Sequence, residues 1–230
     1  MTSRKRNSVL LALVLLITGS TLTTDRQANG FFHTGYATYA WGQNYVGQLG
    51  IGNTTNQTAP VKVGTANNWH ALSAGGQHSL GIRADGTVWA WGHNGFGQLG
   101  IGNTTNQTAP VQVGTANNWQ AISAGQEHSL GIRADGTLWA WGGNTSGQLG
   151  IGNTTNQTVP VQVGTANNWQ AISAGRLHSL GIKTNGTLRA WGNNDSGQLG
   201  IGNTTDQSAP VQVGASTYWS AIDAGNAYSL

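Results

Sequence analysis

The sequence predicts an all-β protein, a β-propeller built from four-stranded blades. The stretch Ala90-Trp91-Gly92, followed after four residues by GQLGIGNTTNQTAPVQVG, recurs with small changes from Ala40, Ala140 and Ala190, at steps of 50 residues. An uninterrupted repeat of this size is typical of propellers, solenoids and related arrays. The 36 glycines favour short strands joined by turns. Four such strands in each repeat are the content of one propeller blade.

Four strands are expected in each repeat, and we name them a to d in chain order. In one copy they span Trp119–Gly125, Ser129–Arg133, Thr137–Gly142 and Val161–Val163. The first three are runs rich in β-forming residues, and Asp135-Gly136 between b and c accepts the positive φ angles of a tight hairpin. These features predict an up-and-down antiparallel sheet.

The connection between strands c and d is expected to be a long loop. It is rich in Gly and Asn and runs from Gly143 to Thr158. Pro160 is then expected to open strand d, because proline is tolerated at a strand start or on an edge strand.

The side chains of strands a and c indicate how the sheets pack. Strand a is predicted to be the inner strand, because Ala121, Ser123 and Ala124 are small enough for the crowded centre of a ring. In strand c, Trp139 and Trp141 share one face while Leu138 and Ala140 share the other, since side chains alternate along a strand. Apolar residues on both faces predict a sheet that is covered by a neighbour on each side.

The first 30 residues differ from the repeats. Arg4, Lys5 and Arg6 precede the apolar run Val9–Ile17, and small residues follow up to Ser20. This order is typical of a secretory signal peptide, so we assign 1–20 to a signal peptide cleaved near Ser20 and 21–35 to a linker. An uncleaved anchor is the alternative, but nine apolar residues fall short of the ~20 that span a bilayer. We therefore expect a secreted or periplasmic protein with no stable membrane insertion after signal removal.

Composition excludes several classes of function. The formal net charge of +3 includes the three basic residues of the signal segment, and without them seven basic residues face seven acidic ones. No cluster of Lys or Arg follows Arg6, so the basic stripe that a nucleic-acid-binding protein needs is missing. The absence of cysteine excludes disulfides, thiolate metal sites and cysteine nucleophiles.

The repeat resembles a known family. The unit AGQEHSLGIRADGTLWAWGGNTSGQLGIGN at Ala124–Asn153 and its copies are similar to the RCC1 (regulator of chromosome condensation) repeat, through AG, HSL, DG, WAWG, N and GQLG at fixed spacing. The resemblance covers 36–230, which we divide into units 41–90, 91–140, 141–190 and 191–230. It implies a β-propeller, usually of seven blades.

The number of repeats leaves two interpretations of the ring. Leu230 aligns with Leu80, so Phe31 stands in phase with the position that would follow it. The chain therefore forms either a closed four-bladed ring, with N-terminal strands c and d paired to C-terminal a and b, or an open arc or fragment of a larger ring. We favour the open arc or fragment of a larger, seven-bladed ring, because blades shaped for a ring of seven do not readily close as four. Open edges also allow self-association.

The sequence contains no set of residues typical of an enzyme or a cofactor site. His78, His128 and His178 recur at one position, and we expect them to hydrogen-bond the local turn rather than bind a metal. Asp85 and Asp135 lie in hairpin turns. No paired carboxylates, nucleophile triad or phosphate loop is found, so we expect no catalytic residues, no cofactor and no metal. The NTT sequences match the glycosylation pattern, although loop hydrogen bonding also explains their Asn and Thr.

The copies differ mainly in two connections. These are the a–b turn and the start of the c–d loop, which emerge on the same side of an up-and-down blade. The opposite side, with the RADG and TANN turns, is nearly uniform. We therefore predict a partner-binding face that includes Tyr45, Val46, Gln77, His93, Phe96, Gln126, Glu127, Thr145, Arg176, Leu177, Asp195 and Asn226. Drift of exposed residues after duplication is the alternative explanation.

Three functions are compatible with these features. The first is a secreted, non-enzymatic protein-binding propeller, and since a family member exported by bacteria inhibits β-lactamases, the resemblance makes enzyme inhibition one form of it. The second is a carbohydrate-binding or cell-surface adhesion module, with Tyr45 and Phe96 as platforms for a glycan. The third, nucleotide exchange on a Ran-type GTPase, is disfavoured by the signal segment and by the lack of insertions in the repeats.

Overall fold

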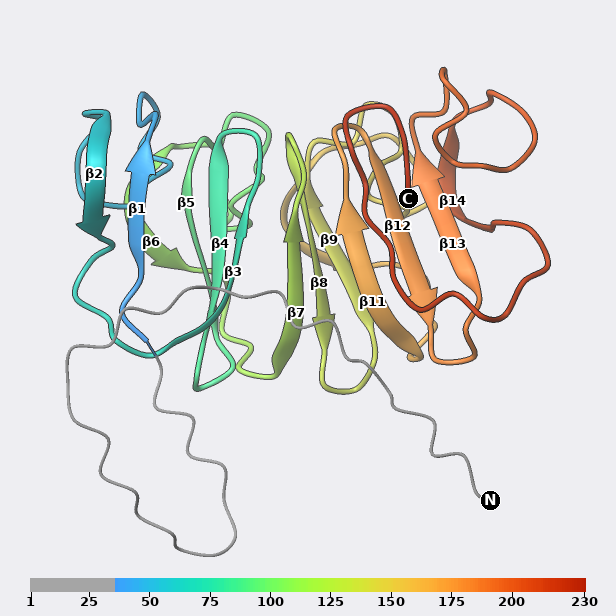
Figure 1. Cartoon of the computed structure of the whole chain (residues 1–230), viewed down its shortest axis with the longest axis horizontal. Helices are drawn as coiled ribbons and strands as arrows, with labels where there is room; N and C mark the ends of the chain where they lie inside the picture. Colours follow the sequence, from blue (N-terminus) through green and yellow to red (C-terminus); the bar gives the residue numbers. More distant parts are fainter. Residues whose placement is uncertain (1–35) are drawn as a thin grey trace, which may run out of the picture. The chain divides into compact units, whose positions relative to one another are not determined.

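The computed structural model describes residues 36–230, which lie within one compact unit, His33–Leu230 (Figure 1). The signal peptide assigned to 1–20 and the linker assigned to 21–35 fall outside the described residues. No helix in the described part is long and apolar enough to cross a membrane.

The described residues form three four-stranded antiparallel sheets and one two-stranded sheet. The two-stranded sheet contains β1 (Tyr39–Gly42) and β2 (Gln57–Lys62). The other three follow in chain order: β3 (Trp69–Ala74), β4 (His78–Arg83), β5 (Val88–Gly92) and β6 (Gln107–Gln112); β7 (Trp119–Ala124), β8 (His128–Arg133), β9 (Leu138–Gly142) and β10 (Gln157–Gln162); and β11 (Trp169–Ala174), β12 (His178–Lys183), β13 (Leu188–Gly192) and β14 (Gln207–Gln212). In each, sequential strands are neighbours.

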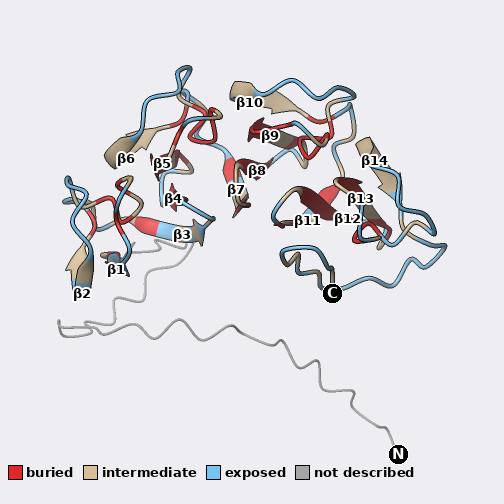
Figure 2. Cartoon of the chain, turned by 90° about the horizontal axis from the view of Figure 1, so that it is seen from above, coloured by how far each residue is buried: buried red, intermediate tan, exposed pale blue. Residues whose placement is uncertain are grey.

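This architecture confirms the predicted fold class and the predicted strands a, b and c. Each complete blade takes its first strand at Trp69, Trp119 or Trp169, and the sheets follow one another along an open arc (Figure 2). Each first strand contacts that of the next sheet: β3 meets β7 and β7 meets β11. The small residues of strand a therefore lie where the blades converge, as the sequence predicted.

The expected position of strand d was wrong by several residues. Strand β10 begins at Gln157 rather than at Val161, so the c–d loop is shorter than predicted and Pro160 lies inside the strand. The register shifts between Gln157 and Val161, which marks a bulge, and β10 is the outer edge of its sheet. An edge strand with a bulge accepts proline because the missing N–H removes no ladder bond.

The core lies between the sheets rather than within any one of them. Leu80, Ile82 and Val88 of one blade pack with Trp119 and Trp141 of the next, and the same arrangement recurs one blade further on. Each pair of neighbouring blades therefore shares one apolar layer, as expected for repeats that cannot bury their faces alone.

One carbonyl group connects the GQLG sequence to the following blade. The backbone oxygen of Gln98 accepts hydrogen bonds from Ser129 Oγ at 2.8 Å and from Trp141 Nε1 at 2.9 Å. A Cβ added to Gly100 would lie 2.8 Å from the Trp141 ring, so only glycine leaves room for the indole. GQLG of one repeat and the second Trp of WAWG in the next repeat are thus in direct contact between two blades.

The b–c hairpins have the role that the sequence predicted for their acidic residues. Asp85 Oδ1 accepts hydrogen bonds from Thr87 N at 3.0 Å and from Thr87 Oγ1 at 2.6 Å. These bonds lower the pKa of Asp85. Asn185 accepts the same pair of bonds, so this position shapes a turn and needs no charge.

Candidate functional site

The two variable connections of each blade lie on the same side of the sheet. The amide of His93, at the start of a c–d loop, donates to the carbonyl of Gln77 in the a–b turn at 2.9 Å. Gly143 and Glu127 are joined in the same way at 2.7 Å. The turns of constant sequence are joined on the other side, where Ala134 N donates to Asn118 O at 2.7 Å. The variable connections follow the upper edge of the sheets in Figure 1.

Where the a–b turns converge, they line an open hollow of about 570 Å³. Its floor is the Ala-Gly sequence that ends strand a in successive repeats. Gly76 N donates to Gly125 O at 3.0 Å and Gln126 N to Gly175 O at 3.3 Å, so backbone bonds connect the floor across blades. A Cβ on Gly125 would lie 2.6 Å from Gly175 O, so the floor requires glycine.

Six of the twelve residues predicted for the binding face line this hollow. They differ in charge, size and polarity from one blade to the next, whereas the floor beneath them is constant. The six are Gln77, His93, Gln126, Glu127, Arg176 and Asn226. Gln77, Arg176 and Asn226 are exposed, and Gln126 and Glu127 are half-buried. The hollow thus combines one acidic and one basic side chain with amides on a rigid backbone.

The other six predicted residues do not line the hollow, and they lie on the c–d loops or, for Leu177, in the a–b turn. They are Tyr45, Val46, Phe96, Thr145, Leu177 and Asp195. Tyr45, Thr145 and Asp195 occupy one equivalent, exposed position at the loop tips, and Tyr45 is 67% exposed. The predicted face is therefore divided into a central hollow and a surrounding row of loop tips.

Phe96 is less available than its place in a loop suggested. Its ring meets the edge of the His93 ring with centroids 6.0 Å apart, and the side chain is half-buried. Gln98 Nε2 donates to His93 Nδ1 at 2.8 Å. Since that nitrogen accepts, His93 carries its proton on Nε2 when neutral.

A buried asparagine holds each c–d loop in place. Asn94 Oδ1 accepts from Leu99 N at 3.0 Å, and its Nδ2 donates to the carbonyls of Asn103 at 2.9 Å and Thr105 at 3.1 Å. Asn103 Oδ1 in turn accepts from Thr105 N at 2.9 Å. The Asn side chain of the NTT sequence thus satisfies a loop backbone amide, and Thr105 takes part through its own backbone groups, so the loop tips are held by a fixed framework.

The imidazoles of the recurring histidines do not bond their own turns, so the expectation for these side chains was wrong; only the backbone carbonyl does so, as where Gly75 N donates to His78 O at 2.9 Å. His78 Nε2 lies 2.9 Å from Ser129 Oγ of the next blade, and His128 makes the same contact with Ser179. Because the Ser129 hydroxyl donates to Gln98 O, the histidine must be the donor, which places the proton of His78 on Nε2. The histidine is a contact between blades.

Burial keeps these histidines neutral. Desolvation lowers the pKa of both His78 and His128 to about 3, with a smaller effect from neighbouring histidines. Nδ1 of each has no hydrogen-bond partner in the described structure. Among residues 36–230 no group of three His, Asp or Glu side chains is placed to hold a metal ion. Sequence reasoning missed the His–Ser bond because its partners are 51 positions apart.

Comparison with protein families identifies the repeat. The model of the Regulator of chromosome condensation (RCC1) repeat matches residues 37–82, 85–132, 135–182 and 185–230. A second model of the same description matches 69–98, 119–148 and 169–198. A search of curated proteins found no match to the chain.

Solved structures share the fold of the described chain. Human WBSCR16 is 24% identical with a TM-score of 0.75, and the match covers 83% of this chain and 51% of that one. Prp20p from Saccharomyces cerevisiae is 22% identical with a TM-score of 0.74, covering 83% and 50%. Yeast RCC1 (Prp20) bound to Kap60 is 22% identical with a TM-score of 0.73, and the match covers 83% of this chain and 48% of that one. The chain spans about half the length of these structures.

Proposed function

Because this chain belongs to the RCC1 repeat family, with repeats matched from 37 to 230, we propose that it is a secreted, non-enzymatic protein-binding propeller. Its binding face consists of the central hollow and the loop tips around it. Inhibition of another enzyme is one concrete form of this function. Export is proposed from the basic and apolar sequence that precedes the repeats.

The observation that carries the proposal is the contrast between floor and lining in the hollow. The floor is fixed by glycines that leave no room for a side chain, as at Gly125 and Gly175. The lining changes in every blade, and Gln77, Glu127 and Arg176 stand at or near equivalent places. A rigid scaffold with varied loop side chains on one face is a common way to build a binding surface.

The size and chemistry of the hollow favour a protein segment as the occupant. A volume of about 570 Å³ suits one projecting loop or a few side chains of a partner. Glu127 and Arg176 offer opposite charges, and the surrounding amides offer both donors and acceptors. Two of the proteins that share this fold bind other proteins: Prp20p binds Gsp1p and histones, and yeast RCC1 binds Kap60.

The proposal is tested by comparing the two faces. The full chain is immobilised, proteins are captured from the medium of the cells that express it, and the dissociation constant of an isolated partner is measured. The triple variant Gln77→Ala, Glu127→Ala, Arg176→Ala should weaken binding at least ~10-fold, since residues in a binding centre contribute 1 kcal/mol or more.

A matched triple variant on the opposite face is the control. Thr65→Ala, Thr115→Ala and Thr165→Ala remove three exposed side chains from the constant turns and should leave affinity unchanged. If the control variant abolishes binding while the hollow variant does not, the face has been assigned wrongly.

A glycan is the alternative ligand, and Tyr45 is the feature that favours it. Its side chain is 67% exposed, whereas Phe96 packs against His93 and offers less of its ring. Binding to a glycan array that is lost in Tyr45→Ala, together with no captured protein, would select the adhesion module. Nucleotide exchange is the less favoured proposal, and stimulated release of labelled GDP from a Ran-type GTPase would select it.

A further inference from the structure

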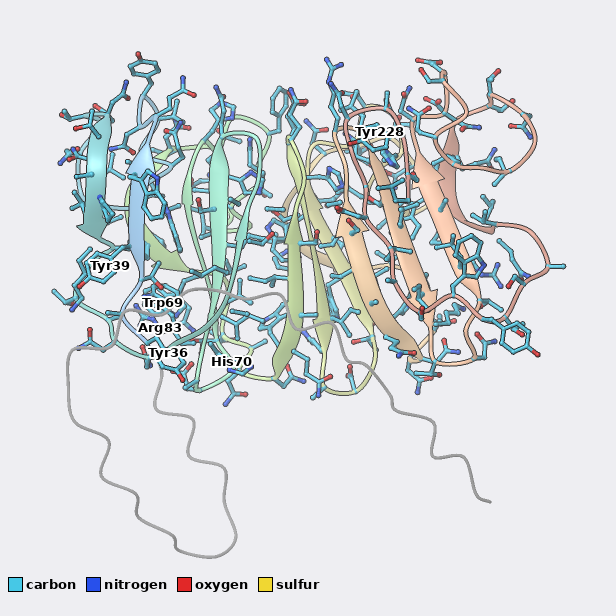
Figure 3. The ribbon with its side chains drawn as sticks, viewed as in Figure 1. Tyr36, Tyr39, Trp69, His70, Arg83 and Tyr228 are labelled. Carbon is cyan, nitrogen blue, oxygen red and sulfur yellow. The ribbon has the colours of Figure 1, made fainter. Side chains whose placement is uncertain are left out.

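In the first complete blade, the arginine that ends strand b has both aromatic and acidic neighbours. The guanidinium carbon of Arg83 lies 5.0 Å from the centre of the Trp69 ring and 3.4 Å from that of Trp89. Figure 3 labels Arg83 beside Trp69 near the lower edge of the sheets, on the side of the constant turns. Burial lowers the pKa of Arg83, and the nearby Asp85 carboxylate opposes this effect. Arg83 is thus covered by two rings and matched by one opposite charge.

The second complete blade repeats this arrangement. The guanidinium carbon of Arg133 lies 4.7 Å from the centre of the Trp119 ring and 3.7 Å from that of Trp139. Burial lowers the pKa of Arg133, and Asp135 again opposes it. The Trp139 indole donates to Thr137 Oγ1 at 2.9 Å, so the second ring is also fixed by a hydrogen bond. In both blades the cation belongs to a neutral, satisfied cluster.

The third complete blade has different residues at three of these positions. Lys183 replaces the arginine, Asn185 replaces the aspartate, and Arg189 replaces the second tryptophan. One aromatic contact is kept, with Lys183 Nζ 5.2 Å from the centre of the Trp169 ring. The cluster has therefore lost its acid and one of its rings, and it has gained a second cation.

The two cations of this blade lie near each other. Arg189 of β13 is opposite Gly181 of β12, and Lys183 N donates to Thr187 O at 3.0 Å. This register makes Lys183 and Arg189 diagonal neighbours on one face of the sheet, within reach of long side chains. Burial and the positive charge of Arg189 both lower the pKa of Lys183. Both side chains are half-buried.

No acidic group among residues 36–230 pairs with either cation. Arg189 Nε is buried and has no hydrogen-bond partner in the described structure. Asn185 Oδ1 accepts from Thr187 N at 3.2 Å and from Thr187 Oγ1 at 2.8 Å, so it keeps the hairpin bonds of aspartate without the charge. Like charges on neighbouring strands repel each other, and a bound anion would offset that repulsion.

We propose that Lys183, Asn185 and Arg189 form an anion-binding site and that its ligand carries a phosphate or sulfate group. The guanidinium presents N–H groups in a planar fork that matches two oxygens of such a group, and the lysine ammonium adds a second point charge. Two cations match the double charge of the ligand. The Asn185 amide nitrogen is a donor at the position where aspartate would repel it.

This site goes beyond the proposed protein-binding face, because it lies on the opposite side of the blade. Thr184 N of its hairpin donates to Asn168 O of a constant turn at 2.8 Å, whereas the hollow is lined by the a–b turns. Failure of either proposal therefore leaves the other standing.

The test is a titration of the ¹⁵N-labelled full chain with inorganic phosphate, followed by NMR at constant ionic strength. Amide signals of residues 183–187 should shift along a saturating curve, and those of the equivalent hairpin, 133–137, should not. Glucose 6-phosphate is titrated in the same way. Tighter binding of the ester selects a phosphorylated molecule as the ligand, and equal or weaker binding selects the free ion.

Two variants restore the residues that the other blades already carry. Asn185→Asp and Arg189→Trp should both fold, as circular dichroism would show, and each should weaken phosphate binding at least ~10-fold. Thr145→Asp and Arg176→Gln make comparable changes of charge on the opposite side and are the controls. They should bind phosphate like the wild type.

A transplant tests whether these residues are sufficient. Asp135→Asn with Trp139→Arg, made in the Asn185→Asp chain, gives the second blade the proposed site. Phosphate should then shift the signals of 133–137 instead of those of 183–187. A wild type without a saturating shift, an Asn185→Asp chain that binds as the wild type does, or a folded transplant that does not bind overturns the proposal.

Discussion

Trp141 and Trp41 occupy equivalent positions in two copies of the repeat, yet Trp141 is fully buried and Trp41 is 62% exposed. Trp141 donates its indole N–H to Gln98 of the preceding repeat, whereas no such acceptor is available to Trp41 in the described structure. The difference teaches that the environment of a residue in this protein depends on the neighbouring repeat as much as on its own. The stability of the fold therefore depends on the interfaces between neighbouring blades, which we call joints.

The largest expected effect is on this pair of tryptophans. Trp141→Ala should lower the free energy of unfolding by about 3–5 kcal/mol, because it leaves a cavity between the blades and removes one of the two hydrogen bonds that the Gln98 carbonyl accepts. Trp41→Ala should change it by less than about 0.5 kcal/mol, as for an exposed residue. Urea denaturation followed by circular dichroism measures both. Equal losses in the two variants would contradict the view that the joint, rather than the residue, determines stability.

Much of the fold could be predicted because the repeat carries it in local patterns. Strands a, b and c follow from runs such as TLWAWG and from the Asp-Gly hairpin. Strand d was placed too late because Pro160 suggested a strand start, and a bulge on an edge strand is not visible in sequence. The histidine contact was missed for another reason. Three successive repeats contain both His and Ser at these positions, so the sequence does not show that His78 bonds Ser129 of the next blade rather than the Ser79 beside it.

The candidate site was predictable in outline and not in detail. Differences between the repeats identified the a–b turn and the start of the c–d loop as candidate binding segments, because the residues of the scaffold are constant and those of these two connections vary. The variable residues that line the hollow are those that the convergence of the a–b turns brings together, such as Gln126 and Arg176. Packing within a loop makes others less available, as for Phe96 against His93. Both are three-dimensional properties that spacing alone does not supply.

The second effect concerns the buried histidines of the interior joints. Burial lowers the pKa of His78 and His128 to about 3, below the value of about 6.5 expected when the chain unfolds. The unfolded chain therefore binds more protons, and the stability is fully present above pH 6.5 and is lost as the pH falls toward 3. Each histidine should contribute roughly 1.4 kcal/mol of loss per pH unit within that window.

Urea denaturation at pH 7.0 and 5.5 tests this, with an expected loss of about 3 kcal/mol from the two histidines together. His128→Gln keeps an amide donor toward Ser179 and does not titrate, so it should reduce the loss by about half. A pH dependence unchanged in this variant would show that the interior histidine does not couple folding to protons. The last repeat carries Tyr228 at this position, so the predicted effect belongs to the interior joints.

The smallest expected change in the free energy of unfolding concerns a hydrogen bond that one c–d loop makes and another lacks. Gln198 Nε2 donates to Asn193 Oδ1 at 2.5 Å, but the equivalent Gln148 faces Gly143, and its buried Nε2 has no partner in the described structure. Gly143→Asn should supply that acceptor and raise the free energy of unfolding by about 1 kcal/mol. The new Cβ would lie 3.2 Å from Glu127 O, so a small shift is needed. Gly143→Ala adds the same Cβ without an acceptor, and equal stability of the two variants in urea would contradict the hydrogen bond.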